Sequence, residues 1–193
     1  MNKFIFLIYF GILCSIFSFA QTSDSILLDS TLTNSEISFT DSINALNEQN
    51  QLLSNSRNAY NTGLEFMNND HLEEAIIQFT NAITIDSAFT AAYISRAKCY
   101  EGLNNALAIA DYRTVFSLDS TNLQPLYSIA ALQLKSDKVI AKQTYQTIIS
   151  LNKTEYKAYS QLGVITFLAK DYQEAEQLFT QSLTINTNAY TLN

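Results

Sequence analysis

The chain has 193 residues, a formal net charge of −7 and only 15% charged residues. Such an acidic balance argues against a nucleic-acid partner, because contacts to phosphates require a basic surface. One histidine and four glycines leave no cluster for a metal site and no glycine-rich phosphate loop. The composition therefore favours a protein that is not an enzyme and that has no catalytic residues, cofactor or metal.

Residues 1–20 have the pattern of a secretory signal peptide. Lys3 precedes an apolar run, and the small residues Ser18 and Ala20 stand where a signal peptidase cuts. We expect cleavage after Ala20 and export to the periplasm, the cell envelope or the medium. If the segment stays uncleaved, residues 4–20 are just long enough to anchor the chain in a membrane. A membrane is expected as a partner only in that case.

The next segment, residues 21–42, is predicted to form a flexible tether. It is rich in Ser and Thr, contains neither Gly nor Pro, and holds too few large residues to build a core. An extended chain is therefore expected between the signal peptide and the folded part of the protein.

A short amphipathic helix is predicted over residues 43–55. Apolar residues recur at helical spacing along one stripe, which Asn50 interrupts. The favoured role is a cap on the domain that follows. The alternative is self-association through a short coiled coil, although sustained heptads are absent. The apolar residues of the stripe are Phe39, Ile43, Leu46 and Leu53.

From residue 56 onward, the chain repeats one pattern four times. In the last copy Gly163 precedes Phe179, and 100 residues earlier Gly63 precedes Phe79 with the same spacing. Repeats of this length cannot bury an apolar face alone, so they must stack on their neighbours. The predicted copies are residues 56–89, 90–122, 123–155 and 156–189, followed by a tail at residues 190–193.

This repeat resembles the tetratricopeptide repeat (TPR) family. The family's order of an aromatic, a Leu-Gly pair, a second aromatic, an Ala and a Phe or Tyr is clear in the outer two copies and weaker in the inner two. The resemblance implies an all-α fold, an α-solenoid of about four helix-turn-helix repeats. The proline that ends the family's pattern is replaced here by Ser87, Ser120, Lys153 and Thr187.

Two local features of the repeats follow from the sequence. The second helices of the outer repeats are predicted to begin at capping boxes, Asp70 with Glu73 and Asp171 with Glu174. The inner repeats are one residue shorter between their small helix-crossing residues, and we place the missing residue in the turn.

Single Cys and His residues are predicted to have structural roles. Without the signal peptide, Cys99 is the one remaining cysteine, so no intramolecular disulfide can form and a buried position is expected. His71 lies in a turn without a second ligand of matched type, which favours a surface histidine over a metal ligand.

The resemblance places partner binding on the concave face of the stacked first helices. In family members that hold acidic C-terminal tails, Lys, Asn and Arg side chains clamp the terminal carboxylate, but Leu64 and Ser95 are among the residues at those positions here. Leu64, Leu134 and Val164 are equally compatible with the core between repeats. The predicted groove consists of Tyr60, Asn61, Leu64, Met67, Ile94, Lys98, Tyr127, Leu134, Gln161 and Val164.

These observations lead to two hypotheses of function. The first is a non-catalytic, exported scaffold or adaptor that binds a protein or peptide partner by its side chains. The alternative is a self-associating structural subunit of an envelope assembly, with a homodimer formed through the N-terminal helix or the open end of the array. At that end, residues 189–192 look like the start of another first helix, which leaves an apolar edge to associate.

Overall fold

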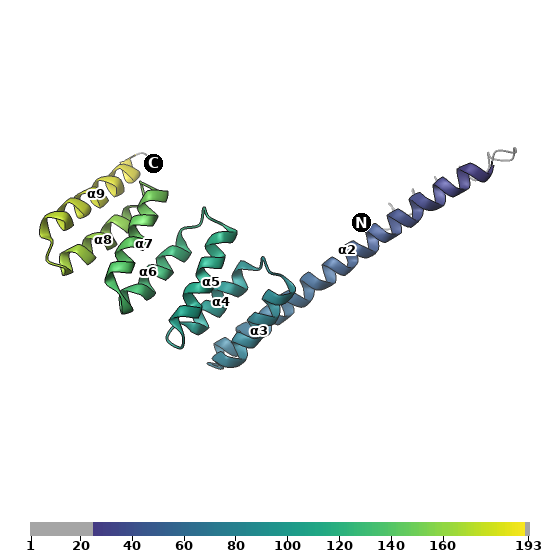
Figure 1. Ribbon diagram of the computed structural model, residues 1–193, viewed down its shortest axis with the longest axis horizontal. Coiled ribbons are helices and arrows are strands. Elements are labelled where there is room, and N and C mark those ends of the chain that lie inside the picture. The colour runs from purple at the N-terminus through teal and green to yellow at the C-terminus, as the bar shows by residue number, and fades with distance from the viewer. Residues whose placement is uncertain (1–24, 192–193) are drawn as a thin grey trace. The chain divides into compact units, whose positions relative to one another are not determined.

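The computed structural model describes the backbone of residues 25–191 and the side chains of residues 38–188. The chain forms two units, Met1–Gln51 and Leu52–Asn193. The predicted signal peptide, residues 1–20, lies outside the described residues. In the part that is described, the regular secondary structure is helical (Figure 1).

The first described helix, α2 (Ser25–Asn68), is longer than the sequence pattern predicts. The predicted tether at residues 21–42 is helical from Ser25 on, and the predicted short helix at residues 43–55 is part of the same element. Neither Gly nor Pro interrupts this stretch, and hydroxyl side chains bond back to the helix, as Ser42 Oγ donates to the Ser38 carbonyl at 2.8 Å. The predicted capping role of the segment stays a prediction.

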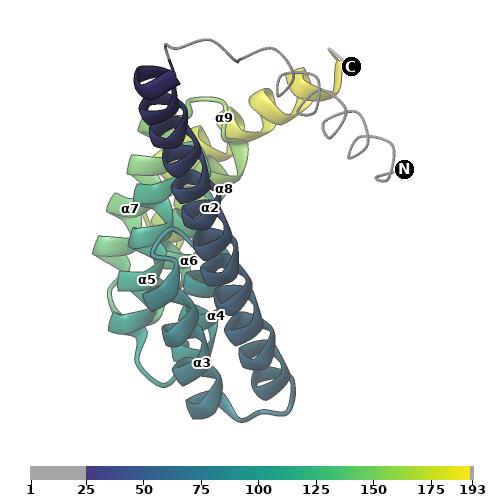
Figure 2. The ribbon, with the colours of Figure 1, turned by 90° about the vertical axis from the view of Figure 1, so that its right-hand side faces the viewer.

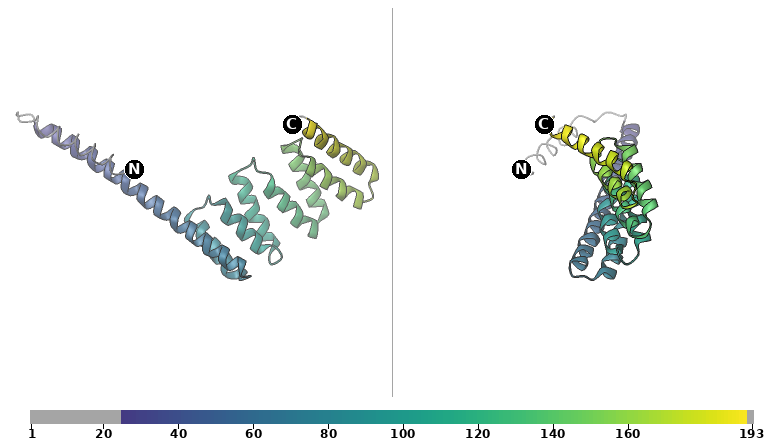
Figure 3. Two further views of the ribbon diagram at one scale, coloured as in Figure 1. Left: turned by 180° about the vertical axis from the view of Figure 1, so that it is seen from behind. Right: turned by 90° about the vertical axis from the view of Figure 1, so that its left-hand side faces the viewer.

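Seven further helices follow in the described part of the chain. From α3 to α9, consecutive helices pack on each other in chain order (Figure 2), and Figure 3 shows the same succession from behind. The predicted all-α fold of stacked helical repeats is confirmed. Among the described residues, no helix is both long and apolar enough to span a bilayer. The helices are α3 (Leu72–Ile85), α4 (Thr90–Tyr100), α5 (Asn105–Leu118), α6 (Gln124–Ser136), α7 (Lys138–Leu151), α8 (Tyr156–Leu168) and α9 (Tyr172–Thr191).

Glycine allows the closest helix crossings in the outer repeats. An ideal Cβ built on Gly63 would lie 2.6 Å from Cε1 of Phe79, and one on Gly163 would lie 2.8 Å from Cε1 of Phe179. Both distances are shorter than van der Waals contact, so any side chain would push the aromatic ring away. Steric contact with the aromatic ring therefore explains why glycine occupies the first helix's small crossing position in the outer repeats.

The core repeats with the sequence. Phe79, Tyr112 and Tyr145 occupy the same position in the first three repeats and are exposed by 0%, 3% and 3%. The equivalent Phe179 is 37% exposed, because no described helix covers this face of α9. Cys99 is buried in the core beside Phe79, as predicted.

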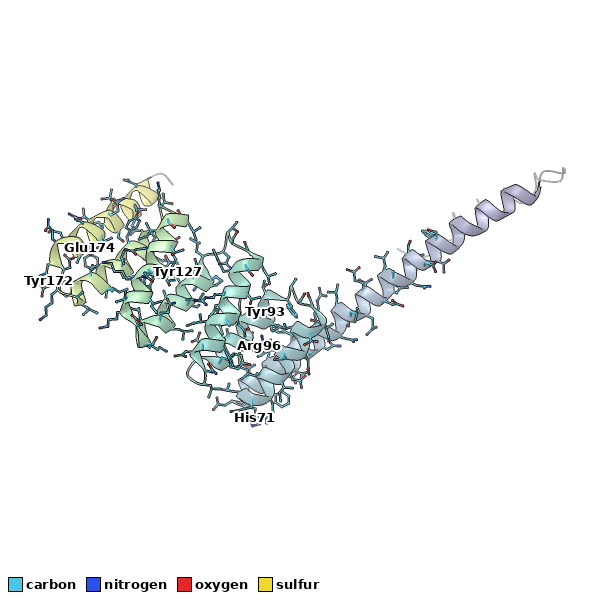
Figure 4. The ribbon with its side chains drawn as sticks, viewed as in Figure 1. His71, Tyr93, Arg96, Tyr127, Tyr172 and Glu174 are labelled. Atoms are coloured by element: carbon cyan, nitrogen blue, oxygen red, sulfur yellow. The ribbon has the colours of Figure 1, made fainter. Side chains whose placement is uncertain are left out.

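A largely buried ion pair within the second repeat is hydrogen-bonded to the first repeat. Nε and Nη2 of Arg96 on α4 donate to the two carboxylate oxygens of Asp111 on α5, at 2.9 and 2.7 Å. Nη1 of Arg96 also donates to Thr80 Oγ1 on α3 at 2.9 Å, and its guanidinium lies over the Tyr93 ring (Figure 4). The hydrogen bond to Asp111 raises the pKa of Arg96. One side chain thus connects three helices.

One of the two predicted capping boxes is wrong. The residue that precedes α3 is His71, which makes no side-chain cap, while Asp70 adopts a left-handed backbone with a φ of 62°. Lys170 has the same conformation, with a φ of 67°, so Asp70 corresponds to Lys170 and His71 to Asp171. Asp tolerates this conformation, which ends the first helix. The Asp half of the second box is present, because Asp171 Oδ1 accepts from the Glu174 amide at 3.2 Å, while the Glu174 carboxylate accepts from Lys142 Nζ instead.

The shorter inner repeats lose their residue in different places. Between α6 and α7 the turn is the single residue Asp137, whose Oδ1 accepts from the amide of Val139 at 2.8 Å, so the predicted deletion in the turn is confirmed there. Between α4 and α5 the turn has four residues, 101–104, including Gly102 with a φ of 88°. Helix α4 ends early instead, because Gly102 readily takes a left-handed conformation.

The last described helix is also longer than predicted. Residues 189–192 were expected to begin a new first helix, but α9 continues without a break to Thr191. Thr187 stands where the family's pattern has proline, and its hydroxyl donates to the Leu183 carbonyl inside the helix at 2.8 Å. Without proline or glycine, nothing in the local sequence ends the helix at Ile185.

Candidate protein-binding groove

An open groove with a volume of about 1160 Å³ lies between the third and fourth repeats. The first helices of these repeats, α6 and α8, supply two of its walls, and α9 supplies the third. A groove of this volume can hold a helical turn or a short extended peptide. The lining residues that matter below are Tyr127, Leu134, Glu155, Gln161, Phe179 and Leu183.

Tyr127 on α6 is the unusual polar residue of the groove (Figure 4). Its hydroxyl is buried and has no hydrogen-bond partner among the described residues. Its ring packs edge-on against Tyr145, with 6.1 Å between the ring centroids. Burial, and then the neighbouring Glu155 carboxylate, raise the pKa of Tyr127. An unpaired buried hydroxyl costs about 1–3 kcal/mol, a cost that Phe would avoid.

The exposed large apolar side chains of the groove come from α9. Phe179 and Leu183 line it and are exposed by 37% and 66%, whereas the equivalent Phe79 and Ile83 of the first repeat are exposed by 0% and 9%. In the first three repeats this face of the second helix is covered by the first helix of the next repeat. The groove therefore contains a helix-packing surface that no described helix covers.

Formal charge in the groove is balanced. Glu155 and Lys157 are the charged residues among those that line it. A single lysine does not make the cluster of cations that an acidic peptide tail requires. Among the described side chains, no group of three or more His, Cys, Asp or Glu residues is placed to hold a metal ion. The remaining polar lining consists of hydroxyls and amides, which suit hydrogen bonds to a neutral segment.

Comparison with solved structures agrees with this geometry. A crystal structure of MamA superposes with a TM-score of 0.59 at 16% identity, covering 81% of this chain and 95% of MamA. The first TPR of Spaghetti (RPAP3), solved with the HSP90 peptide SRMEEVD, superposes with a TM-score of 0.50 at 18% identity, covering 61% of this chain and 94% of that one. The chain has the tetratricopeptide repeat fold.

Sequence comparison finds longer proteins. The TPR chain is 30% identical over 108 residues to mouse DnaJ homolog subfamily C member 7, and 29% identical over the same length to the human protein. The match covers 55% of this chain and 21% of each relative, so the chain spans about a fifth of the length of the curated relatives it matches. No protein-family model matches the sequence.

Three of the predicted groove residues lie together. Tyr127 and Leu134 on α6 and Gln161 on α8 all line the groove of the TPR domain. Leu134 also packs against the core, while Val164, on the same helix as Gln161, is 43% exposed and does not line the groove. These three residues, predicted by counting along the repeats, all lie on first helices.

The other predicted residues lie on the first two repeats. Tyr60, Leu64 and Met67 are partly buried against the core cluster around Phe79, and Ile94 packs against the core of the next repeats. The Tyr60 ring lies 5.6 Å from that of Phe79, centroid to centroid. The remaining two, Asn61 and Lys98, are exposed. Whether these six residues contact a partner stays a prediction.

Sequence reasoning missed the contribution of α9. Phe179, Ser182, Leu183 and Asn186 line the groove, although second helices were not expected on this face. The available signal is the repeat position of Phe179 and Leu183, which is equivalent to that of the buried Phe79 and Ile83 and is therefore suited to contact a further helix.

Proposed function

We propose that this chain is a non-catalytic, exported scaffold that binds a helical or extended segment of a protein partner in the groove of α6, α8 and α9. The fold itself supports a protein-interaction scaffold. Export rests on the signal-peptide pattern of residues 1–20, and the absence of catalysis rests on the lack of any matched set of acid, base or nucleophile in the sequence.

One observation carries the proposal. The groove is lined by the exposed apolar side chains of Phe179 and Leu183 and also by Tyr127, whose hydroxyl is buried and unpaired among the described residues. Apolar anchors next to polar groups that fix orientation are the arrangement by which grooves recognise amphipathic helices and peptides. At the equivalent positions of the first three repeats, the side chains are covered by the first helix of the next repeat. This favours a partner segment that is helical and has an apolar face.

The chemistry of the groove also limits the partner. The HSP90 peptide bound by the RPAP3 domain carries three acidic residues in its sequence SRMEEVD. Here the groove offers Lys157 as its one cation, next to Glu155. We therefore propose a partner segment with little net charge, held by apolar contacts and by hydrogen bonds to the hydroxyl and amide lining.

The experiment selects peptides that bind the full chain from a random peptide library and measures their affinities for groove variants by calorimetry. Leu183→Gln should weaken binding by about tenfold or more, because it removes a central apolar anchor. Val139→Gln is the matched control, since Val139 on α7 is equally exposed, at 67% against 66%, and does not line the groove.

A second variant tests the polar part of the site. Tyr127→Phe should leave the fold as stable as the wild type or more so, because it removes an unpaired buried hydroxyl. It should weaken those selected peptides whose binding moves a neighbouring side chain and brings a polar group to this hydroxyl, which the structure keeps from solvent. Equal affinity of all three variants for every selected peptide would exclude this groove as the binding site.

A further inference from the structure

The first unit presents an exposed apolar stripe on α2. Phe39, Ile43 and Leu46 are exposed by 68%, 42% and 58%. Their spacing of four and then three residues is that of positions d, a and d of a heptad, and the next a position is Asn50. These four side chains lie on one face of the helix.

The period is longer than the stripe alone. In the sequence, large apolar residues stand at four successive d positions, seven residues apart, while two a positions are polar, Glu36 and Asn50. The same register continues along α2, where Tyr60, Leu64 and Met67 occupy positions d, a and d and pack against the core around Phe79. This face of α2 is therefore one that packs on other helices. The d positions are Leu32, Phe39, Leu46 and Leu53.

The charges of the segment point to the kind of helix that pairs with it. The acidic residues of residues 38–51, Asp41 and Glu48, both occupy position f, on the side opposite the apolar stripe. The flanking e and g positions carry no charge, for example Ser42 and Asn47. Over residues 38–51, two identical helices can therefore approach along this stripe without bringing like charges together, whereas farther toward the N-terminus the two Glu36 residues would share an a layer.

We propose that residues 38–51 of α2 form a parallel, two-stranded coiled coil with the same segment of a second copy of this chain. Asn50 sets the orientation, because in a parallel pair in register it faces the Asn50 of the other copy and the two amides hydrogen-bond. In an antiparallel pair the same amide would face an apolar layer. Because the e and g positions carry no charge, the pair of Asn50 amides is the main determinant of how the two helices align.

Disulfide trapping tests the geometry directly. Asn50→Cys and Glu48→Cys are made in the full chain carrying Cys14→Ser, so that Cys99, which is buried, is the one other thiol. Residues at a face each other across the dimer axis, within the roughly 7 Å between Cα atoms that a disulfide allows, whereas residues at f lie on opposite outer sides. Mild oxidation should link Asn50→Cys into dimers several-fold more completely than Glu48→Cys. Equal trapping of the two variants, or none, overturns the proposal.

Sedimentation velocity tests the association without a cross-link. The wild-type chain should shift from monomer to dimer as its concentration rises into the micromolar range, and Leu46→Gln should move this shift to at least about tenfold higher concentration. Leu52→Gln is the matched control, because Leu52 is similarly exposed, at 53%, but occupies position c. A wild type that stays monomeric, or an equal effect of both variants, overturns the proposal. Peptide binding in the groove should be unchanged by Leu46→Gln, so the two proposals fail separately.

Discussion

Adding one methyl group at the same position of the first and fourth repeats should have unequal effects. In Gly63→Ala, the new Cβ would lie 2.6 Å from Cε1 of Phe79, and in Gly163→Ala it would lie 2.8 Å from Cε1 of Phe179. The initial clashes are alike. Their surroundings differ, because Phe79 is completely buried and Phe179 is 37% exposed.

Two opposing contributions set the size of each effect. Alanine in place of glycine favours a helix by about 1 kcal/mol, and overpacking a well-filled core costs roughly 1–3 kcal/mol. The Phe79 ring has no free space to enter, so the overpacking cost should lie in the upper part of that range, and Gly63→Ala should lower the free energy of unfolding by about 1–2 kcal/mol net. The Phe179 ring can turn toward solvent, so Gly163→Ala should be within about 0.5 kcal/mol of the wild type.

Urea denaturation followed by circular dichroism measures both variants. A loss of 1 kcal/mol corresponds to about 2–4 °C in Tm for a chain of this size, so thermal melts give an independent check. The double variant Gly63→Ala, Phe79→Leu should recover part of the loss, because the smaller side chain makes room for the methyl group. Equal destabilisation of the two single variants would refute the steric argument and the assignment of Phe179 to an uncovered face.

Three further outcomes are expected. Asp111→Asn should lower the free energy of unfolding by about 3–5 kcal/mol in urea titrations, because it leaves the buried guanidinium of Arg96 without its carboxylate. Glu174→Gln, which breaks the partly exposed pair with Lys142 across the third and fourth repeats, should cost at most about 1 kcal/mol in the same assay. Burial raises the pKa of the Cys99 thiol, so the unfolded chain loses this proton at lower pH than the folded one. The contribution of Cys99 to stability should be complete below about pH 8.5 and decline as the pH rises further, which urea titrations of the wild type and Cys99→Ala across that range can detect.

The fold was predictable because its determinants recur locally. Gly63 and Phe79 return as Gly163 and Phe179 at a fixed distance along the chain, and the steric contact between each pair explains why the spacing is kept. Each repeat packs mainly on its neighbours in sequence. A period in the sequence therefore specifies the succession of helices without any long-range information.

Helix ends were less predictable. The capping box assigned to Asp70 fails by one residue, because the chain needs a left-handed residue between the helices and Asp serves there as well as at a cap. The tether predicted from Ser and Thr content is helical from Ser25, because residues 25–62 contain no glycine or proline that could end α2. Gly63 does not end it either, since the helix continues to Asn68. Composition measures the average preference of a segment, whereas a helix continues until something ends it.

Three of the ten predicted groove residues line the groove, and all three lie on first helices. Tyr127, Leu134 and Gln161 follow from counting along first helices. Phe179 and Leu183 occupy positions that are core in the earlier repeats, and they reach the groove only because no described helix lies over them. The pattern describes what each side chain is suited to contact, and tertiary structure decides whether that contact is present.

Because the helices pack in chain order, the walls of the groove should differ in their resistance to local unfolding. Among the described helices, α9 packs mainly on α8 and reaches α7 through the Glu174–Lys142 ion pair, whereas α6 packs on a helix on each side. The hairpin of α8 and α9 can therefore open by itself, as a local unfolding unit, at a lower free energy than the interior repeats. A ligand that bridges α6 and α9 would add about 2.7 kcal/mol to the protection of this hairpin at a hundred times its Kd. Hydrogen exchange of the α9 amides would then slow most on binding. Ligand binding would therefore be detected mainly as increased order of α9, the outermost described helix of the groove.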